Sequence, residues 1–398
     1  MSEPRFVYLD WAATAPLCEE AAAAMAPYLV PGLENLALGG NANALYDAGR
    51  AAFAALEDAR ASLARDVGAS RPDEITFTSG ATEADNMALF GLVEAAAERA
   101  RQKGRKEFVP HVVTTEIEHD AVLVTGYELR RRGVEVTFVK PDAQGRITPA
   151  ALSGALRENT VLASVCWANN EIGTVQDIPA LARVAHDAGA LFHTDAVQAL
   201  GKVPVDVRAA GVDAASFSAH KVGGPKGVGA LYLKARTPFH ALVYGGGQES
   251  GRRSGTQNVC GAAGFAAAAH AACAAQAAEA ARLVPLRDAL YAGLSAHGRV
   301  TPAVSVPSGS TEFAPHVVMV CVDGFESETL ILRLSQAGFA VSGGSACATR
   351  DLEPSHVLKA LGIPRDRALG ALRISLGRLT TERDISEFLA AFSACIGE

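Results

Sequence analysis

The sequence predicts an α/β fold with a mostly parallel central sheet and a smaller α+β unit at the C-terminus. Between residues 74 and 233, short β-rich runs alternate with helical stretches, which is typical of a parallel sheet covered on both faces. After an alanine-rich stretch that begins at residue 261, a second and shorter alternation follows. The chain has 398 residues, a length that suits two domains. We expect a large domain at 15–262 and a small domain formed by 1–14 together with 263–398.

The large unit contains seven expected strands, at 74–78, 112–115, 134–139, 161–165, 191–194, 214–218 and 229–233. Expected helices between them include 83–103, 121–131 and 178–187. Ligands of such sheets bind at the carboxyl ends of the strands, so residues that follow a strand are the first candidates for a site.

The stretch 261–282 predicts one long helix, because alanine has the highest helix propensity and neither Gly nor Pro interrupts it after Gly264. The helix would link the large unit to the small one. In the small unit we expect strands or helices at 317–322, 327–336, 340–342, 355–361, 371–376 and 381–396.

Composition narrows the class of protein. The net charge of −7 gives no general attraction for nucleic acid or anionic membranes. Seven scattered cysteines without a C-x-x-C pair argue against a disulfide framework and against a structural metal site, and they fit a reducing cytoplasm. The N-terminus lacks the pattern of a signal peptide, and no uninterrupted apolar stretch reaches the roughly 18 residues of a membrane span.

A lysine and a cysteine stand in the two most informative motifs. Lys221 ends Ser218-Ala219-His220-Lys221, directly after an expected strand, and offers the amine that an aldehyde cofactor such as pyridoxal 5′-phosphate requires. Cys347 follows the glycine-rich Ser342-Gly343-Gly344-Ser345-Ala346, which leaves it little core to join and favours a reactive thiol.

Polar residues also follow three other expected strands. Asp195 could pair with a protonated pyridine nitrogen, although a carboxylate there could instead be a cap or turn residue. His119 could stack on a flat ring and exchange protons. Asn170, in Asn169-Asn170-Glu171-Ile172-Gly173, could bond the phenolic oxygen of such a ring, or simply form a turn.

Three further motifs each allow two readings. Ser79-Gly80-Ala81-Thr82-Glu83 opens a helix and could bind a phosphate, or Thr82 could only cap the helix. The glycine-rich loop that carries Thr256 could be a hinge, a surface loop, or a contact to the phosphate of a neighbouring subunit. Arg373 lies in an apolar strand, so its guanidinium requires either a substrate carboxylate or a structural ion pair.

Together these motifs resemble the pyridoxal-phosphate-dependent cysteine desulfurases of the class-V aminotransferase-like family, in the subgroup with the longer cysteine loop. The resemblance runs from Tyr8 nearly to the C-terminus. It departs from the family pattern at residues 41–46, at Trp11 and at Ser250, which affects the substrate pocket and loop docking rather than the chemistry.

The resemblance implies a fold-type I homodimer in which Lys221 forms the internal aldimine and His119 stacks on the ring. It implies that Asp195 contacts the ring nitrogen and that Gln198 and Asn170 contact the ring-oxygen side. It also implies that the cofactor phosphate is bound by Ala81, Thr82, Ser218, His220 and the other subunit's Thr256. Asn170 and Arg373 would bind the substrate.

The implied reaction converts L-cysteine to L-alanine and leaves the sulfur as a persulfide on Cys347, for transfer to an acceptor such as an iron–sulfur scaffold protein. A selenocysteine lyase, or a transaminase or epimerase of the same fold, remains an alternative. A nicotinamide-dependent dehydrogenase is disfavoured, because the sequence has no G-x-G-x-x-G after its first strand followed by an acid about 20 residues later.

Overall fold

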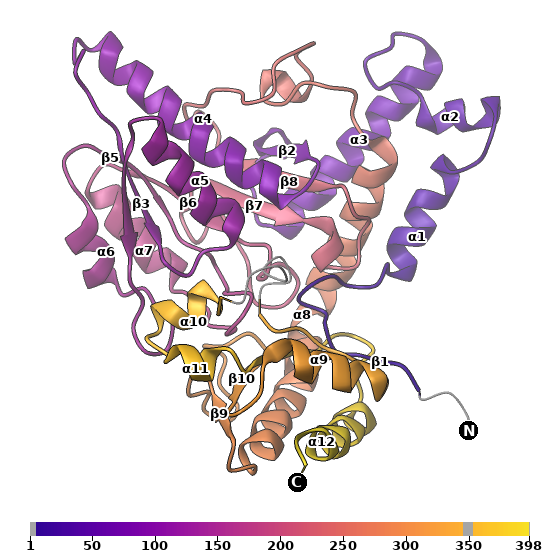
Figure 1. Ribbon diagram of the computed structural model, residues 1–398. Coiled ribbons are helices and arrows are strands. Elements are labelled where there is room, and N and C mark those ends of the chain that lie inside the picture. The colour runs from indigo at the N-terminus through magenta and orange to yellow at the C-terminus, as the bar shows by residue number, and fades with distance from the viewer. Residues whose placement is uncertain (1–4, 345–352, 398) are drawn as a thin grey trace.

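The computed structural model describes residues 5–344 and 353–397. Its largest feature is a seven-stranded sheet in the order β2-β8-β7-β6-β5-β3-β4 (Figure 1). These strands are β2 (Ile75–Thr78), β3 (His111–Thr115), β4 (Glu135–Val139), β5 (Thr160–Ser164), β6 (Leu191–Asp195), β7 (Ala214–Ser218) and β8 (Gly229–Leu233). β8 runs antiparallel to both neighbours and the other pairs are parallel, which confirms the predicted mostly parallel sheet.

Helices cover both faces of this sheet, and each face has its own cluster of buried apolar side chains. One face packs against α4 (Ala81–Gln102) and α5 (Asp120–Arg131). The other packs against α3 (Asp47–Asp66), α6 (Pro149–Ala155), α7 (Ile178–Asp187) and the first half of α8. The short N-terminal helices α1 (Glu19–Met25) and α2 (Leu36–Gly39) pack against α8 and α3 respectively.

The alanine-rich helix α8 spans Val259–Ser295, so the predicted end at residue 282 is wrong. The helix continues through Pro285, which removes one backbone hydrogen bond. The buried leucines beyond it, such as Leu290 and Leu294, offset that cost, because each buried leucine contributes roughly 1.5–3 kcal/mol. By length and hydropathy α8 could cross a membrane, although the sequence analysis expected no stretch of this kind. Its two halves contribute side chains to two protein cores.

The C-terminal part has its own small sheet, in which β10 (Val317–Val322) lies between β12 (Ala371–Ser375) and β9 (Val300–Pro302), all antiparallel. Helices α9 (Ser327–Gln336) and α12 (Glu382–Ile396) cover one face, and α10 (His356–Ala360) and α11 (Arg365–Ala368) cover the other. Near the N-terminus, β1 (Val7–Tyr8) pairs with β11 (Phe339–Ala340). The N-terminal segment therefore joins the C-terminal part, while the domain boundaries stay a prediction.

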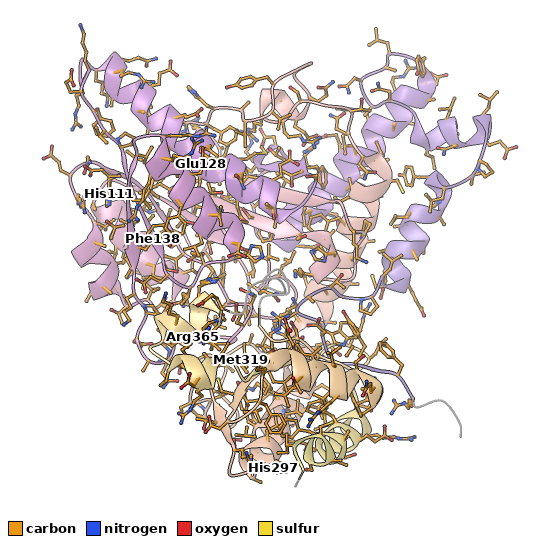
Figure 2. The ribbon with its side chains drawn as sticks, in the orientation of Figure 1. His111, Glu128, Phe138, His297, Met319 and Arg365 are labelled. Carbon is orange, nitrogen blue, oxygen red and sulfur yellow. The ribbon has the colours of Figure 1, made fainter. Side chains whose placement is uncertain are left out.

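Apart from the end of α8, the predicted elements are present with boundaries that agree within two residues. Figure 2 shows how the two parts are arranged: His111 and Phe138 mark the β3–β4 edge of the large sheet, and Met319 and Arg365 lie in the C-terminal part. The α+β unit predicted for the C-terminus is thus confirmed. A cavity lies where the two parts meet.

Candidate active site

A cavity of about 560 Å³ lies at the carboxyl edge of the parallel strands and is closed on one side by β12. It is lined by ten of the predicted site residues, namely Ala81, Thr82, His119, Asn170, Asp195, Gln198, Ser218, His220, Lys221 and Arg373. The sheet explains why they meet. β7, β6, β5 and β3 are adjacent parallel strands, so the residues that follow them gather at one edge.

Lys221 lies in a single 3₁₀ turn, Ala219–Lys221, which directly follows β7. Its Nζ donates hydrogen bonds to the carbonyl oxygens of Ala12 at 2.7 Å and Ala13 at 2.8 Å. Both carbonyls belong to the N-terminal segment that crosses to the C-terminal part. The amine is therefore held at the seam between the two parts, inside the cavity.

Asp195 ends β6 and is 7% exposed. Its Oδ1 accepts a hydrogen bond from the backbone N–H of Val197 at 2.9 Å. Burial raises the pKa of the carboxyl group, and the charges of His119 and Lys221 and the Val197 bond act against that rise. A cation beside Asp195 would stabilise its buried carboxylate. A protonated ring nitrogen is such a cation, so Asp195 is suited to pair with it.

Two further carboxyl groups lie buried near Asp195, and the sequence reasoning missed both. Asp85 is fully buried on the inner face of α4, lines the cavity, and has no hydrogen-bond partner on either oxygen. Burial, followed by the charge of Asp195, raises the pKa of Asp85 well above its ordinary value. Burial also raises the pKa of Glu118 to about 8. Glu118 is therefore mostly protonated at neutral pH, and burial disfavours the charged form of Asp85 as well.

A neutral histidine completes this floor of the cavity. His193 is fully buried on β6, and its ring nitrogens contact the hydroxyls of Ser164 at 2.8 Å and Ser216 at 3.0 Å. Burial lowers its pKa to about 3, so it brings no positive charge to Asp85, whose Oδ1 lies 3.6 Å away. We define the cavity floor as the lining residues Asp85 and Asp195 together with the buried Glu118 and His193, which do not line the cavity themselves.

His119 is the N-cap of α5, and its Nδ1 accepts the backbone N–H of Ala121 at 3.1 Å. An accepting Nδ1 requires that the neutral ring carry its proton on Nε2. The bond fixes the ring on the cavity wall and leaves Nε2 to act toward a bound molecule. The stacking role of His119 stays a prediction.

The start of α4 offers a second binding feature. The helix begins at Ala81, its N-cap is Gly80, and no side chain caps it, so the alternative that Thr82 only caps the helix is wrong. Backbone N–H groups at the start of this 22-residue helix line the cavity and can receive an anion. His220 lies on the same cavity wall, where burial and the charges of Lys221, Lys202 and Lys226 lower its pKa to about 4.

Arg373 has the structural ion pair that was one of its two predicted partners. It is 2% exposed, and its guanidinium contacts Asp10 Oδ1 at 3.1 Å and donates to the backbone oxygen of Asn170 at 3.0 Å. A structural ion pair is thus present. Arg373 also lines the cavity, and its Nε has no hydrogen-bond partner, so the same guanidinium can receive a carboxylate.

Among the described site residues, Thr256 lies elsewhere. Thr256 is exposed and does not line the cavity of its own chain. Cys347 lies outside the described residues. Described residues on both sides of Cys347 in the sequence lie beside Glu171. The Ser355 hydroxyl donates to a carboxylate oxygen of Glu171, and a Cβ atom at Gly344 would lie 3.1 Å from the same oxygen. Glu171 is the neighbour of Asn170 in the cavity wall.

Cys166 is a cysteine on the cavity wall that the sequence reasoning did not single out. It is buried, and burial together with Glu118 and Asp195 raises the pKa of its thiol well above the ordinary value. A thiol that stays protonated is a poor nucleophile. Its position just beyond the end of β5 is the sequence signal that could have indicated its place in the site.

These residues fit pyridoxal phosphate. The floor has the buried carboxyl group of Asp195 for a ring nitrogen, and carboxyl oxygens of Asp85 and Glu118 nearby lack hydrogen-bond partners. The cavity also holds an amine at Lys221 and an uncapped helix start for a phosphate. The donor set thus matches the cofactor's three functional ends.

Comparisons with known proteins agree with this geometry. The aminotransferase class-V family model matches residues 7–388. The chain is 44% identical to a cysteine desulfurase IscS of Anaeromyxobacter sp. over 95% of this chain and 89% of that protein. It is 40% identical to a cysteine desulfurase IscS of Dictyoglomus turgidum over 96% and 92%.

A solved structure of a NifS-like protein superimposes with a TM-score of 0.87, at 34% identity over 98% of this chain and 99% of that one. The predicted resemblance and fold class are confirmed. The chain belongs to the class-V aminotransferase family of pyridoxal-phosphate enzymes, among its cysteine desulfurases.

Proposed function

We propose that the protein removes sulfur from L-cysteine, with Lys221 as the catalytic amine and Cys347 as the first sulfur acceptor. The observation that carries the proposal is the convergence in one cavity of Lys221, the buried Asp195, the uncapped start of α4 and Arg373. Each of these matches one functional end of the cofactor or of an amino-acid substrate.

In this proposal the floor and the start of α4 hold pyridoxal phosphate. Asp195 faces the ring nitrogen, His119 stacks on the ring, and Gln198 and Asn170 face the ring oxygen. The phosphate is received by the N–H groups of Ala81 and Thr82 with Ser218 and His220. When bound, the cofactor supplies an aldehyde that condenses with amines and a ring that withdraws electrons from the substrate Cα.

The chain's own groups then handle the substrate. Arg373 binds the substrate carboxylate with Asn170 beside it, which fixes the Cα–H bond near Lys221. The Lys221 amine takes the Cα proton and returns it later. His119 exchanges a proton through Nε2, since Nδ1 is occupied by the bond from Ala121.

The sulfur step needs no external oxidant. The Cys347 thiolate attacks the substrate sulfur, an S–S bond forms, and the substrate C–S bond breaks. Its electron pair stays with the carbon skeleton, which takes up protons and leaves as L-alanine. One thiol and one L-cysteine therefore give one Cys347 persulfide and one L-alanine, with all atoms accounted for.

A homodimer completes the site in this proposal. Thr256 is exposed and away from its own cavity, which suits a phosphate contact to the partner subunit. Large apolar side chains are also exposed along the N-terminal helices, including Leu29, Leu33 and Leu45 at 66%, 85% and 89%. Such a patch is typical of a surface covered by another chain.

The acceptor of the sulfur and the place of action are further parts of the proposal. The relatives named cysteine desulfurase IscS support delivery to an acceptor such as an iron–sulfur scaffold protein. The six described cysteines are all free, which supports a reducing cytoplasm. Separate apolar cores support the division into domains at 15–262 and at 1–14 with 263–398.

The test is to incubate the purified, cofactor-loaded protein with L-cysteine and to quantify L-alanine and protein-bound persulfide, beside a Cys347→Ser variant and a Cys166→Ser control. We expect both products from the wild type and the Cys166 variant, and neither from Cys347→Ser with the cofactor still bound. A Cys347→Ser variant that forms alanine at the wild-type rate would contradict the sulfur role. Faster turnover of L-selenocysteine than of L-cysteine would favour the lyase, and transamination without sulfur release would favour the transaminase.

A further inference from the structure

A second cavity of about 120 Å³ shares Lys221 with the active-site cavity. Lys221 lines both. Among the polar residues of the second cavity are Lys202 and His316, and Trp11 and Leu283 contribute to its apolar wall. His316 is 1% exposed, and its Nδ1 has no hydrogen-bond partner. Two basic side chains, those of Lys202 and His316, thus share this cavity with Lys221.

Lys202 and His316 both contact the side chain of Gln198. Lys202 Nζ donates to Gln198 Oε1 at 3.0 Å, and His316 Nε2 lies 3.2 Å from the same oxygen. At its other end, Gln198 Nε2 donates to the carbonyl oxygen of Ala12 at 2.9 Å. An ammonium can only donate and a carbonyl can only accept, so the orientation of the Gln198 amide is specified at both ends.

The network reaches Lys221 directly, because Lys221 Nζ donates to the same Ala12 oxygen at 2.7 Å. A chain of three hydrogen bonds therefore runs from Lys202 through Gln198 and Ala12 to Lys221. Gln198 also lines the active-site cavity. A displacement of Lys202 would change both the amide that faces the cofactor and the carbonyl that holds the catalytic amine.

The charges around Lys202 are mostly positive. Burial, followed by the charges of Lys221 and Arg373, lowers the pKa of Lys202 to about 7. His316 is neutral, because burial and the same cations lower its pKa well below the ordinary value. The carboxylate in the cavity lining, Glu279, is paired with Arg282 at 2.8 Å, and Arg378 is paired with Glu20 at 3.2 Å. In its protonated form, Lys202 therefore repels a positive charge on Lys221.

We propose that Lys202 is a positioning residue for the catalytic lysine. Through Gln198 it fixes the amide that shares the Ala12 carbonyl with Lys221, and its positive charge favours the unprotonated Lys221 nitrogen that the chemistry requires. The inference rests on the proposed role of Lys221, and it adds Lys202 to the residues that support that role.

The test uses the cofactor-loaded enzyme with Lys202→Met and, as the matched control that keeps the charge, Lys202→Arg. The visible absorption band of the bound cofactor follows the proton on the Lys221 nitrogen, and its midpoint is measured by pH titration. Removal of a nearby positive charge favours the protonated form, so we expect the midpoint of Lys202→Met to rise by about one pH unit. kcat for L-cysteine should fall about tenfold, with KM within about threefold of wild type.

Lys202→Arg should recover most of the midpoint and of kcat. A Lys202→Met enzyme that titrates and turns over as the wild type does would overturn the inference and leave the proposed function intact. A rise in KM alone would also overturn it, because that result means lost substrate binding. A wild-type protein that develops no visible band with pyridoxal phosphate would overturn the proposed function, and the inference with it.

Discussion

The two ends of the active-site cavity differ in their charge. The floor gathers three buried carboxyl groups, of which Asp195 is the one with a counter-charge nearby, and the neutral His193 adds none. The seam with the C-terminal part instead carries the buried Arg373, with Asp10 already beside it. The floor is thus poised for a cation and the seam for an anion. A zwitterionic substrate and a cofactor with a basic ring nitrogen satisfy both ends at once.

The difference also has an energetic side. A buried carboxyl group without partners, such as Asp85, costs stability, and burial in the apolar clusters of the fold offsets that cost. At the seam, the Asp10 carboxylate and the Asn170 carbonyl accept hydrogen bonds from the Arg373 guanidinium. Substitutions at the floor should therefore alter chemistry and pH dependence, and substitutions at the seam should alter substrate binding.

The largest effect should come from Asp195→Asn at the floor. An amide cannot hold a protonated ring nitrogen as a carboxylate does, so kcat for alanine formation should fall about 10²–10³-fold. Cofactor content, read from the visible band, should stay close to wild type, and Asp195→Glu should recover part of the rate. Turnover within threefold of wild type would show that the floor does not control the ring nitrogen.

At the seam, Arg373→Lys should raise KM for L-cysteine about 10–100-fold, because a lysine cannot bind a carboxylate bidentately. The surface variant Arg157→Lys, whose arginine pairs with Glu135 at the edge of the sheet, is the control and should leave KM unchanged. An unchanged KM together with lower thermal stability would assign Arg373 to the ion pair with Asp10 alone.

The smallest effect should come from Glu118→Gln, measured as unfolding of the cofactor-free protein at several pH values. The pKa of Glu118 is raised to about 8, so between its ordinary value near 4.5 and pH 8 the folded protein binds more protons than the unfolded chain. Wild-type stability should therefore fall as pH rises through this range. The glutamine variant should show a shallower decline over the same pH range, because it has no carboxyl group to titrate at this position. Parallel profiles for both proteins would show that Glu118 is charged in the fold.

Much of the fold was predictable because local patterns agree with the tertiary structure. β7, β8, β10, α7 and α9 have the predicted boundaries, since runs of β-branched residues and amphipathic stretches are bounded there by turn residues. The prediction that residues after successive strands share a site also holds, because adjacent parallel strands end at one edge.

The layered architecture, the family and most residues of the cavity could thus be predicted from the chain alone, because these depend on local periodicity and on residues placed at strand ends. Only the tertiary structure decided that α8 continues through Pro285, that Asp85 is a buried acid rather than an exposed helix residue, and that Lys202 contacts Gln198. These features depend on burial and on contacts between distant segments. The free energy of each is set by its surroundings in space, and no local pattern in the chain contains that information.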